Sequence, residues 1–290
     1  MSNPLIQHHI PLGPMTSWHI GGMAEYFAQP SNLNMLSALI AVSHDLAVTW
    51  LGLGSNILIR DNGIKGLVIC TRGLNQLERL DSFDVYAEAG VASAKMARFC
   101  QKHDLGGGEF FAGIPGTIGG ALQMNAGAFG GMTWEHVHSV MIIDEAGQLI
   151  EKGPSDFEIG YRWVKPLFPN FLGFVSARFQ FKPKAGLDGK EDIRLLLQKR
   201  QASQPIGTFN CGSVYRNPPG DHAARLIEAC GFKGKSVGEA MVSPKHANFI
   251  VNMGHATAKD VEALMTEIEA AVFERFKIKL EREVKILGEI

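Results

Sequence analysis

The sequence predicts an α+β protein of roughly two domains, and three small ones fit its length as well. Its 290 residues suit about two domains at roughly 150 residues each. Short β-like runs lie between stretches with helical spacing. Residues 182–190 (KPKAGLDGK) are rich in Lys, Gly and Pro and read as a linker before a C-terminal α+β unit.

Composition excludes several classes of protein. Lys+Arg 28 against Asp+Glu 29 leaves a net charge of -1, so we expect no broad basic face for nucleic acid. Hydrophobic residues at 46% and charged residues at 20% exclude disorder as the main state. The four cysteines show neither C-x-x-C pairs nor metal-ligand spacing. With no signal peptide or membrane span in view, we expect a cytoplasmic protein without membrane partners or a bound metal.

The N-terminal part is predicted to hold two helices among several strands. One helix begins at Ser31 and turns Met35, Leu36, Leu39 and Ile40 to one side. A second helix covers 94–103, with Met96, Phe99 and Cys100 inward. The predicted strands are 48–51, 57–59, 67–69, 85–89, 140–143, 148–150 and 174–181.

The C-terminal part begins with a charged helix at 191–203, ended by Pro205. A strand near Ser213, a helix at 222–230 and a strand at 248–251 follow. Thr257 then caps a long helix, with Asp260 three residues on. Its inward stripe is Val261, Leu264, Met265, Ile268 and Val272. We expect lobes at 1–78, 79–188 and 189–290, the last strand returning to the first lobe.

Two glycine loops are candidates for binding phosphate. Residues 106–131 hold ten of the 33 glycines, and alone they fit a tight loop entering a helix at least as well as a functional site. A second loop at 52–56 (GLGSN) changes the balance. Main-chain N–H groups from both loops, with the side chains of Ser55, Asn56 and Thr117, suit a pyrophosphate without needing lysines.

Other motifs are weaker when taken singly. The loop at 52–57 starts like a dinucleotide fingerprint, but Ile57 replaces the third glycine; a P-loop at 229–236 fails at Ala229. His136 and His138 have no third ligand nearby, so we expect no metal. Taken alone, 210–218 is typical of a turn, 243–252 of a loop and 280–284 of an edge strand with solvated charges.

In this order the motifs resemble the bacterial UDP-N-acetylenolpyruvoylglucosamine reductases of the compact subtype, flavoenzymes of peptidoglycan precursor synthesis. The resemblance covers nearly the whole chain. Its motifs are TSWHIGG (16–22), LGSN (53–56), GIPGTIGG (113–120), NAGA (125–128), GYR (160–162), GSVYRNP (212–218), KHANF (245–249) and EV (283–284). This sequence departs from the family pattern at Val164, where a serine is usual, at Arg216, where lysine is common, and at Trp18-His19 for Phe-Arg.

The resemblance implies a two-lobed FAD-binding domain of the vanillyl-alcohol-oxidase (PCMH) type, made by 1–78 and 79–188, and a smaller substrate domain at 189–290. It implies non-covalent FAD and a UDP-sugar substrate. The expected cofactor-binding residues are Gly52, Gly54, Ser55, Asn56, Gly113, Pro115, Gly116, Thr117, Gly119, Gly120, Asn125, Gly127 and Tyr161. The expected substrate-binding residues are Tyr215, Arg216, Asn217, Lys245 and His246.

The resemblance also implies a reaction. NADPH reduces FAD, and the hydride passes to the enolpyruvyl group of UDP-N-acetylglucosamine enolpyruvate, which gives UDP-N-acetylmuramate for cell-wall synthesis, cell shape and division. Arg162 and a protonated Glu283 would stabilise the enolate, and Ser213 would donate the proton. We expect a monomer, and the choice of NADPH over NADH follows from the resemblance.

Two alternatives stay open. One is another FAD oxidoreductase of the same fold, such as a sugar or lactone oxidase, although no histidine for covalent flavin attachment lies in either glycine loop. The other is a flavin- or nucleotide-binding module without catalysis. The joint presence of Arg162, Ser213 and Glu283 favours the reductase, because a pure binding protein does not require all three.

Overall fold

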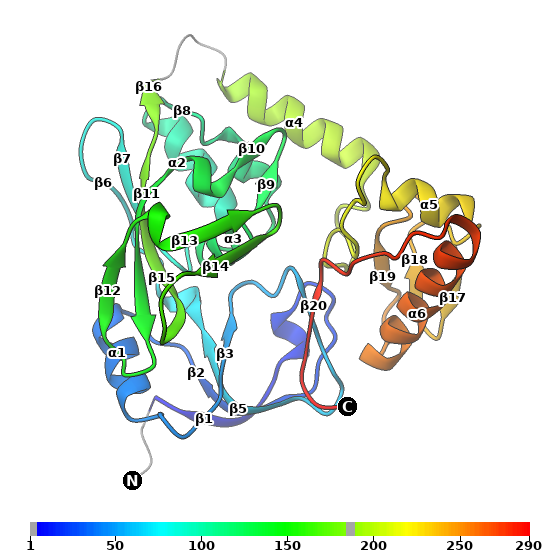
Figure 1. Ribbon diagram of the computed structural model, residues 1–290, viewed down its shortest axis with the longest axis horizontal. Helices are drawn as coiled ribbons and strands as arrows, with labels where there is room; N and C mark the ends of the chain where they lie inside the picture. The colour runs from blue at the N-terminus through cyan, green and yellow to red at the C-terminus, as the bar shows by residue number, and fades with distance from the viewer. Residues whose placement is uncertain (1–4, 184–188) are drawn as a thin grey trace. The chain divides into compact units, whose positions relative to one another are not determined.

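A computed structural model describes residues 5–183 and 189–290 (Figure 1). Helices and short strands mix along the chain, as the sequence predicts. The chain divides into two compact units. Unit 1 contains 1–7, 26–53 and 66–199, and unit 2 contains 8–25, 54–65 and 200–290. These units differ from three consecutive lobes, because 8–25 and 54–65 group with the C-terminal part of the chain.

The structure has the following helices and strands. The helices are α1 (Leu33–Ala41), α2 (Ser93–Lys102), α3 (Ile118–Gln123), α4 (Gly189–Ser203), α5 (Ala223–Ala229) and α6 (Ala258–Phe276). The strands up to residue 132 are β1 (Gln7–Pro11), β2 (Met23–Ala28), β3 (Val48–Leu51), β4 (Ile57–Ile59), β5 (Ile64–Cys70), β6 (Leu77–Arg79), β7 (Asp84–Glu88), β8 (Leu105–Gly106), β9 (Gly127–Ala128) and β10 (Gly131–Met132). The later strands are β11 (Val137–Asp144), β12 (Leu149–Lys152), β13 (Phe157–Gly160), β14 (Trp163–Pro166), β15 (Phe171–Gln180), β16 (Lys182–Pro183), β17 (Ser236–Val237), β18 (Ala240–Val242), β19 (Ile250–Asn252) and β20 (Lys285–Leu287).

A five-stranded antiparallel sheet, in the order β12–β11–β15–β7–β6, forms the centre of unit 1. Successive residues of β11 point to opposite faces of this sheet. Val140 and Ile142 join a core cluster with α2 and α3, whereas Ile143 joins a second cluster with α1. The sheet therefore buries apolar side chains on both faces, and one of them carries α2 and α3.

A second sheet has the order β1–β2–β5–β3, with β3 and β5 parallel. Its strand β5 is buried at six of seven positions, Lys65 being exposed. A run so apolar fits a strand covered on both sides. The strand predicted at 67–69 is therefore confirmed, and extends further at both ends.

Unit 2 combines α5 and α6 with the antiparallel sheet β17–β18–β19. The predicted stripe on α6 lies entirely in the core of this unit. Thr257 caps α6 as predicted: its hydroxyl accepts from Asp260 N at 3.1 Å. The Asp61 carboxylate adds a second cap, accepting from the main-chain N–H groups of Ala258 and Lys259 at 3.0 and 3.2 Å.

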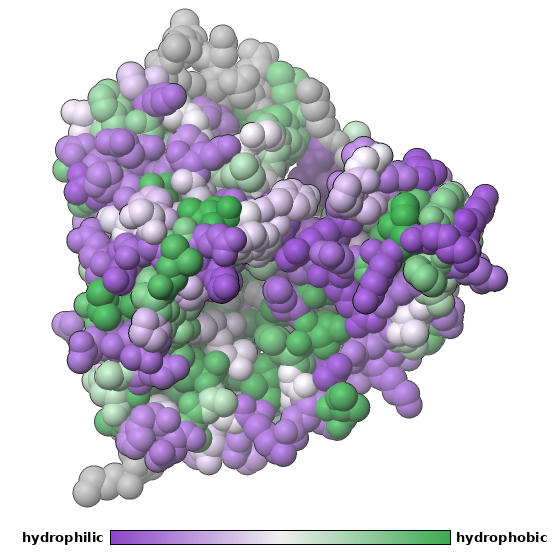
Figure 2. Space-filling model, in the orientation of Figure 1, coloured by the Kyte–Doolittle hydropathy of each residue, from purple (hydrophilic) through white to green (hydrophobic). Residues whose placement is uncertain are grey.

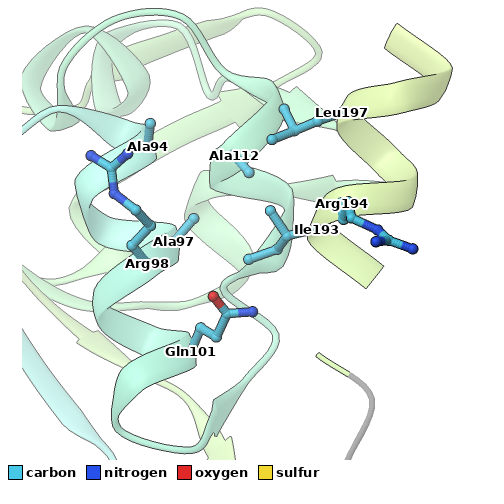
Figure 3. Close-up of a pocket in the computed structure, with 8 residues that line it drawn as sticks. All are labelled: Ala94, Ala97, Arg98, Gln101, Ala112, Ile193, Arg194 and Leu197. Carbon is cyan, nitrogen blue, oxygen red and sulfur yellow. The ribbon is translucent and has the colours of Figure 1, made fainter. Parts of the chain in front are cut away.

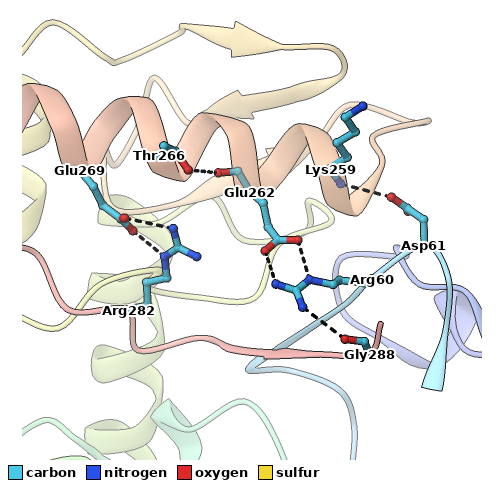
Figure 4. Close-up of polar contacts among 8 residues, drawn as sticks. All are labelled: Arg60, Asp61, Lys259, Glu262, Thr266, Glu269, Arg282 and Gly288. Carbon is cyan, nitrogen blue, oxygen red and sulfur yellow. Dashed lines mark hydrogen bonds and ion pairs between the residues drawn. The ribbon is translucent and has the colours of Figure 1, made fainter. Parts of the chain in front are cut away.

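The C-terminal strand β20 pairs in parallel with β4, so it returns to a segment within the first 78 residues. Two ion pairs tie these segments to α6 (Figure 4). Arg60 meets Glu262 at 2.9 and 3.0 Å, and Arg282 meets Glu269 at 2.5 and 3.0 Å. The charges that the sequence suggested were solvated at 280–284 are therefore partly taken up by α6.

Two predictions differ from the structure. At 182–190, Lys182–Pro183 form β16 against β8 and α4 begins at Gly189, while 184–188 lie outside the described residues. Near Ser213 there is no regular strand, but an isolated bridge between Tyr215 and Arg282. Gly212 has φ +82°, a left-handed conformation that interrupts an extended segment.

The surface is of mixed character. Hydrophilic residues cover much of the face drawn in Figure 2, with apolar residues in patches between them. Within the ranges described, none of the helices has both the length and the apolar character needed to cross a bilayer. The same residues contain no cluster of three His, Cys, Asp or Glu side chains suited to a metal ion.

Candidate active site

The starts of α2 and α3 lie side by side in unit 1. An isolated antiparallel bridge joins Ala92, just before α2, to Thr117, just before α3. Two main-chain hydrogen bonds flank this bridge: Ser93 N donates to Gly116 O at 3.0 Å, and Ile118 N donates to Val91 O at 2.8 Å. Because each helix N-terminus carries a partial positive charge, two adjacent ones suit an anionic group such as a pyrophosphate.

Two features beside the starts of α2 and α3 fit a bound cofactor. The Ser93 side chain is fully buried, and among the described residues its hydroxyl has no hydrogen-bond partner. A buried hydroxyl without a partner is costly, so it marks a place for a ligand or water. A Cβ added to the exposed Gly120 would meet only Thr117 Oγ1, at 4.0 Å. The open space beside Gly120 and the two helix starts fit the diphosphate of FAD.

Gly119 packs closely against protein, and its contact with cofactor stays a prediction. A Cβ there would lie 2.9 Å from Ala89 Cβ, and Gly119 N donates to Ala89 O at 2.9 Å. The absence of a side chain at Gly119 thus allows α3 to pack against the chain that follows β7. Gly116 has a φ of +134°, which residues with a side chain rarely adopt, so glycine is favoured at this position. The exposed Pro115 precedes it.

Two other glycines of the predicted cofactor site also make close protein contacts. A Cβ at Gly52 would lie 2.6 Å from Thr117 Oγ1, so the two glycine loops touch within unit 1 at this point. A Cβ at Gly113 would lie 2.4 Å from the ring of Phe129. The predicted proximity of the two loops is therefore present at Gly52.

The remainder of the second glycine loop belongs to unit 2. Gly54 has φ +63° and lies against Met15, where a Cβ would come within 2.5 Å of the Met15 carbonyl oxygen. Ser55 follows, half-buried. The side-chain amide of Asn56 donates to Glu283 O at 3.3 Å. Asn56, predicted to bind cofactor, thus has a contact with a residue predicted to be catalytic.

Arg162 lies at the tip of the β13–β14 hairpin in unit 1, in the two-residue turn between Gly160 and Trp163. Its φ is +65°, a left-handed conformation that is unfavourable for a residue with a side chain. Its guanidinium donates to Gly127 O at 2.9 Å and lies 5.1 Å from the ring centroid of the exposed Tyr161. Unfavourable backbone conformations cluster at functional sites, which supports a role for Arg162 in the reaction.

Asn125 and Gly127 support this hairpin from the side of the glycine segment. The Asn125 amide donates to Gly160 O at 3.1 Å, and its oxygen accepts from Trp134 N at 3.2 Å. Both ends of the Asn125 side-chain amide therefore bond to protein, and its contact with cofactor stays a prediction. A Cβ at Gly127 would lie 2.5 Å from Gly131 O in the neighbouring strand.

The segments that carry Ser213 and Glu283 are neighbours in unit 2. Glu283 N donates to Val214 O at 2.8 Å, and Arg216 N donates to Glu281 O at 2.9 Å, on either side of the bridge. Ser213 and Glu283 are both half-buried. The structure thus pairs the main-chain segments of two of the three predicted catalytic residues, which lie 70 positions apart in sequence.

Tyr215 does not fit its predicted contact with substrate. It is 1% exposed in the core, and its hydroxyl donates to Met265 O at 3.0 Å. Its main-chain N–H and C=O both bond to the side-chain amide of Asn248, at 2.9 and 2.8 Å. Tyr215 and Asn248 therefore hold the serine segment in place. The polar density of the KHANF motif was the only sign of Asn248 in the sequence.

The other expected substrate residues are partly occupied by protein contacts. Arg216 lies 3.6 Å from the Glu281 carboxylate, and the Asn217 oxygen accepts from Ala223 N at 3.1 Å, at the start of α5. The Lys245 ammonium donates to Gln201 O. Burial lowers the pKa of His246, and the charge of Lys233 lowers it further, so this imidazole is neutral at pH 7.

One pocket of about 370 Å³ opens between α2 and α4 in unit 1. Figure 3 shows its lining, in which alanine, leucine and isoleucine side chains are joined by Arg98 and Arg194. Its other lining residues are Ala94, Ala97, Gln101, Ala112, Ile193 and Leu197. None of the predicted site residues lines this pocket.

Comparison with known proteins places both parts of the chain. Residues 24–153 match the FAD binding domain family, and residues 204–287 match the C-terminal domain family of UDP-N-acetylenolpyruvoylglucosamine reductase. Proteins with that reductase name are 51% identical in Methylococcus capsulatus, over 97% of this chain and 92% of that one, and 48% identical in Coxiella burnetii, over 96% and 94%. The crystal structure of the enzyme from Thermus caldophilus superposes with a TM-score of 0.84 at 28% identity, covering 98% and 99%.

Fold and site together define an FAD-containing oxidoreductase of the α+β class, with an FAD-binding domain and a smaller C-terminal domain. The predicted fold class and cofactor class are confirmed. The chain belongs to the UDP-N-acetylenolpyruvoylglucosamine reductase family.

Proposed function

We propose that this enzyme transfers a hydride from NADPH, by way of FAD, to the enolpyruvyl group of UDP-N-acetylglucosamine enolpyruvate. The product is UDP-N-acetylmuramate, for peptidoglycan synthesis. One observation carries the proposal: the segments with Ser213 and Glu283 are paired through main-chain hydrogen bonds, in a chain whose relatives are named for this reduction.

The residues that would hold FAD are those at the starts of α2 and α3, with Gly120 leaving room beside them. When bound, FAD accepts a hydride from one substrate and delivers it to another. The other steps fall to this chain's own side chains.

Addition of a hydride to the methylene carbon of the substrate leaves negative charge on the adjacent carbon, shared with the carboxylate as an enolate. The Arg162 guanidinium and a protonated Glu283 donate hydrogen bonds to that charge. Ser213 then gives its hydroxyl proton to the adjacent carbon, where the new C–H bond forms, and water restores the serine proton. A carboxylate enolate is basic enough for a serine to serve as its acid.

The UDP group is assigned to Arg216, Asn217, Lys245 and His246. Arg216 and Lys245 supply positive charge, whereas His246 is neutral and can serve only as a hydrogen-bonding group. Tyr215 has no part in this assignment, because its ring and hydroxyl are buried. We further propose a monomer that acts in the cytoplasm, where the four free cysteines stay reduced.

The deciding experiment follows NADPH oxidation by the purified protein with and without the UDP-enolpyruvyl sugar, alongside its flavin absorbance. We expect a yellow protein whose NADPH oxidation depends on the sugar, with NADH less effective. A flavin-bound protein that oxidises other sugars with oxygen would identify the oxidase alternative. Flavin without any turnover would identify a binding module.

A further inference from the structure

We propose that Asn56 is a positioning residue for Glu283. Its side-chain amide holds the main chain of Glu283, the carboxylic acid that stabilises the enolate in the proposed function. The Asn56 side chain would thereby set the position of the acid, in place of the cofactor contact that the resemblance implies for it. The inference rests on the proposed function, in which Glu283 is catalytic.

The first observation is where Asn56 bonds. The side-chain Nδ2 of Asn56 donates to Glu283 O at 3.3 Å, and the main-chain carbonyl oxygen of Asn56 accepts from Lys285 N at 3.0 Å. The parallel pairing of β4 and β20 starts at the next position, with Ile57 opposite Lys285. The Asn56 side chain therefore adds a hydrogen bond to the ladder at the point where Glu283 leaves it.

The second observation is that the other side of Glu283 is also held. Its main-chain N–H donates to Val214 O at 2.8 Å, in the serine segment. Both main-chain polar groups of Glu283 are thus engaged, the N–H by the serine segment and the C=O by Asn56. Hydrogen bonds on both sides restrain the main chain of Glu283 and so help to fix where its carboxyl group starts from.

The third observation is that the loop does not depend on Asn56 for its own shape. Gly54, with its φ of +63°, lies against the main chain of Met15, and Ser17 N donates to Gly54 O at 3.0 Å. Removal of the Asn56 amide should therefore free Glu283 on one side and leave the loop in place. A displacement of about 1 Å at a catalytic group can cost roughly a hundredfold in rate.

The test compares Asn56→Ala and Asn56→Asp with the wild-type holoenzyme. Neither variant can donate the hydrogen bond, and aspartate keeps the size of the side chain. Three quantities are measured: FAD content, the rate of flavin reduction by NADPH, and the rate at which the UDP-enolpyruvyl sugar reoxidises the reduced flavin. We expect a loss of about 10- to 100-fold in the third alone. Asn75→Ala, at an exposed asparagine of unit 1, is the matched control.

A double-mutant cycle with Glu283→Gln separates positioning from an independent role. If Asn56 acts through Glu283, Asn56→Ala costs little further rate once Glu283 is already replaced. Losses that multiply, loss of FAD, or equal slowing of both half-reactions would each overturn the inference. An active wild type with an unaffected Asn56→Ala variant also overturns it, while the proposed function stands. A wild type without the reductase activity overturns both.

Discussion

Glu269 on α6 and Arg282 in the C-terminal segment form a two-pronged ion pair, with N–O distances of 2.5 and 3.0 Å and about a third of each side chain exposed (Figure 4). Arg282 directly precedes Glu283 in the sequence. Glu269, the partner of Arg282, is seven residues from Glu262, the partner of Arg60. Both glutamates therefore face the same side of α6.

We expect Glu269→Gln to lower the free energy of unfolding by about 1–2 kcal/mol, because Arg282 loses a charge-assisted, two-pronged partner that is only partly screened by water. Denaturant unfolding measures the loss. Glu267→Gln, at an exposed position of the same helix, is the control and should change little. Equal effects of the two changes would show that the ion pair contributes nothing specific.

Gly120 and Gly119 should respond differently to substitution. Gly120→Val should give a folded protein that purifies without FAD, because its side chain would fill the open space beside the helix starts. Gly119→Val should reduce thermal stability first, since its Cβ meets Ala89 at 2.9 Å. Flavin absorbance and the melting temperature distinguish the two. A yellow Gly120→Val protein with full occupancy would move the cofactor away from this loop.

Two substitutions of Arg162 should both abolish turnover and differ in stability. Arg162→Gly and Arg162→Ala both remove the guanidinium and its bond to Gly127 O, and both should lose turnover. Only glycine adopts a φ of +65° without strain, so the glycine variant should be more stable by about 1 kcal/mol. Thermal unfolding of the two inactive variants gives the difference. Equal stability would mean that the turn relaxes around alanine.

Ser213→Ala should separate the two halves of the reaction. Flavin reduction by NADPH should stay near normal, and oxidation by the enolpyruvyl substrate should fall by about 10²- to 10⁴-fold, as for a positioned acid. Ser213→Cys should recover part of the loss, because a thiol is the stronger acid.

Stopped-flow kinetics measures both steps of that comparison, and Cys211→Ala is the control. Cys211 is buried, and burial raises the pKa of its thiol, so it is a poor rival donor. If Ser213→Ala slows both steps equally, the serine is structural.

His136 should make stability fall in acid. Its ring lies between Phe110 and Phe181, at 5.7 and 5.3 Å between centroids, and burial lowers its pKa below the ordinary 6.5. Glu135 and Glu109 act against this shift, and Lys182 adds to it. Because the folded state disfavours the proton, the contribution is complete above about pH 6.5 and is lost as pH falls below that value.

Melting temperatures measured between pH 5 and pH 8 check this prediction. His136→Phe keeps the aromatic stack and should flatten the acid side of the curve. The same slope in the variant would assign the acid sensitivity to other groups.

Local patterns were sufficient for much of this fold. The α6 stripe from Val261 to Val272 and the Thr257 cap follow from spacing alone, because helix periodicity and capping are properties of neighbouring residues. The tight hairpin that carries Arg162 was not predicted from the sequence, because its two strands have only four residues each and its turn contains no glycine.

The sequence by itself determined the class of protein, the two glycine loops and the identity of the residues proposed for catalysis. These follow from the order of motifs along the chain, which can be recognised without the structure. Only the tertiary structure decided which partner each residue has. Gly119 packs on Ala89, Asn125 braces a hairpin, Tyr215 belongs to the core, and Asn56 holds Glu283. Hydrogen bonds such as the one from Asn56 to Glu283 join residues 227 positions apart, and no local pattern records a contact across that separation.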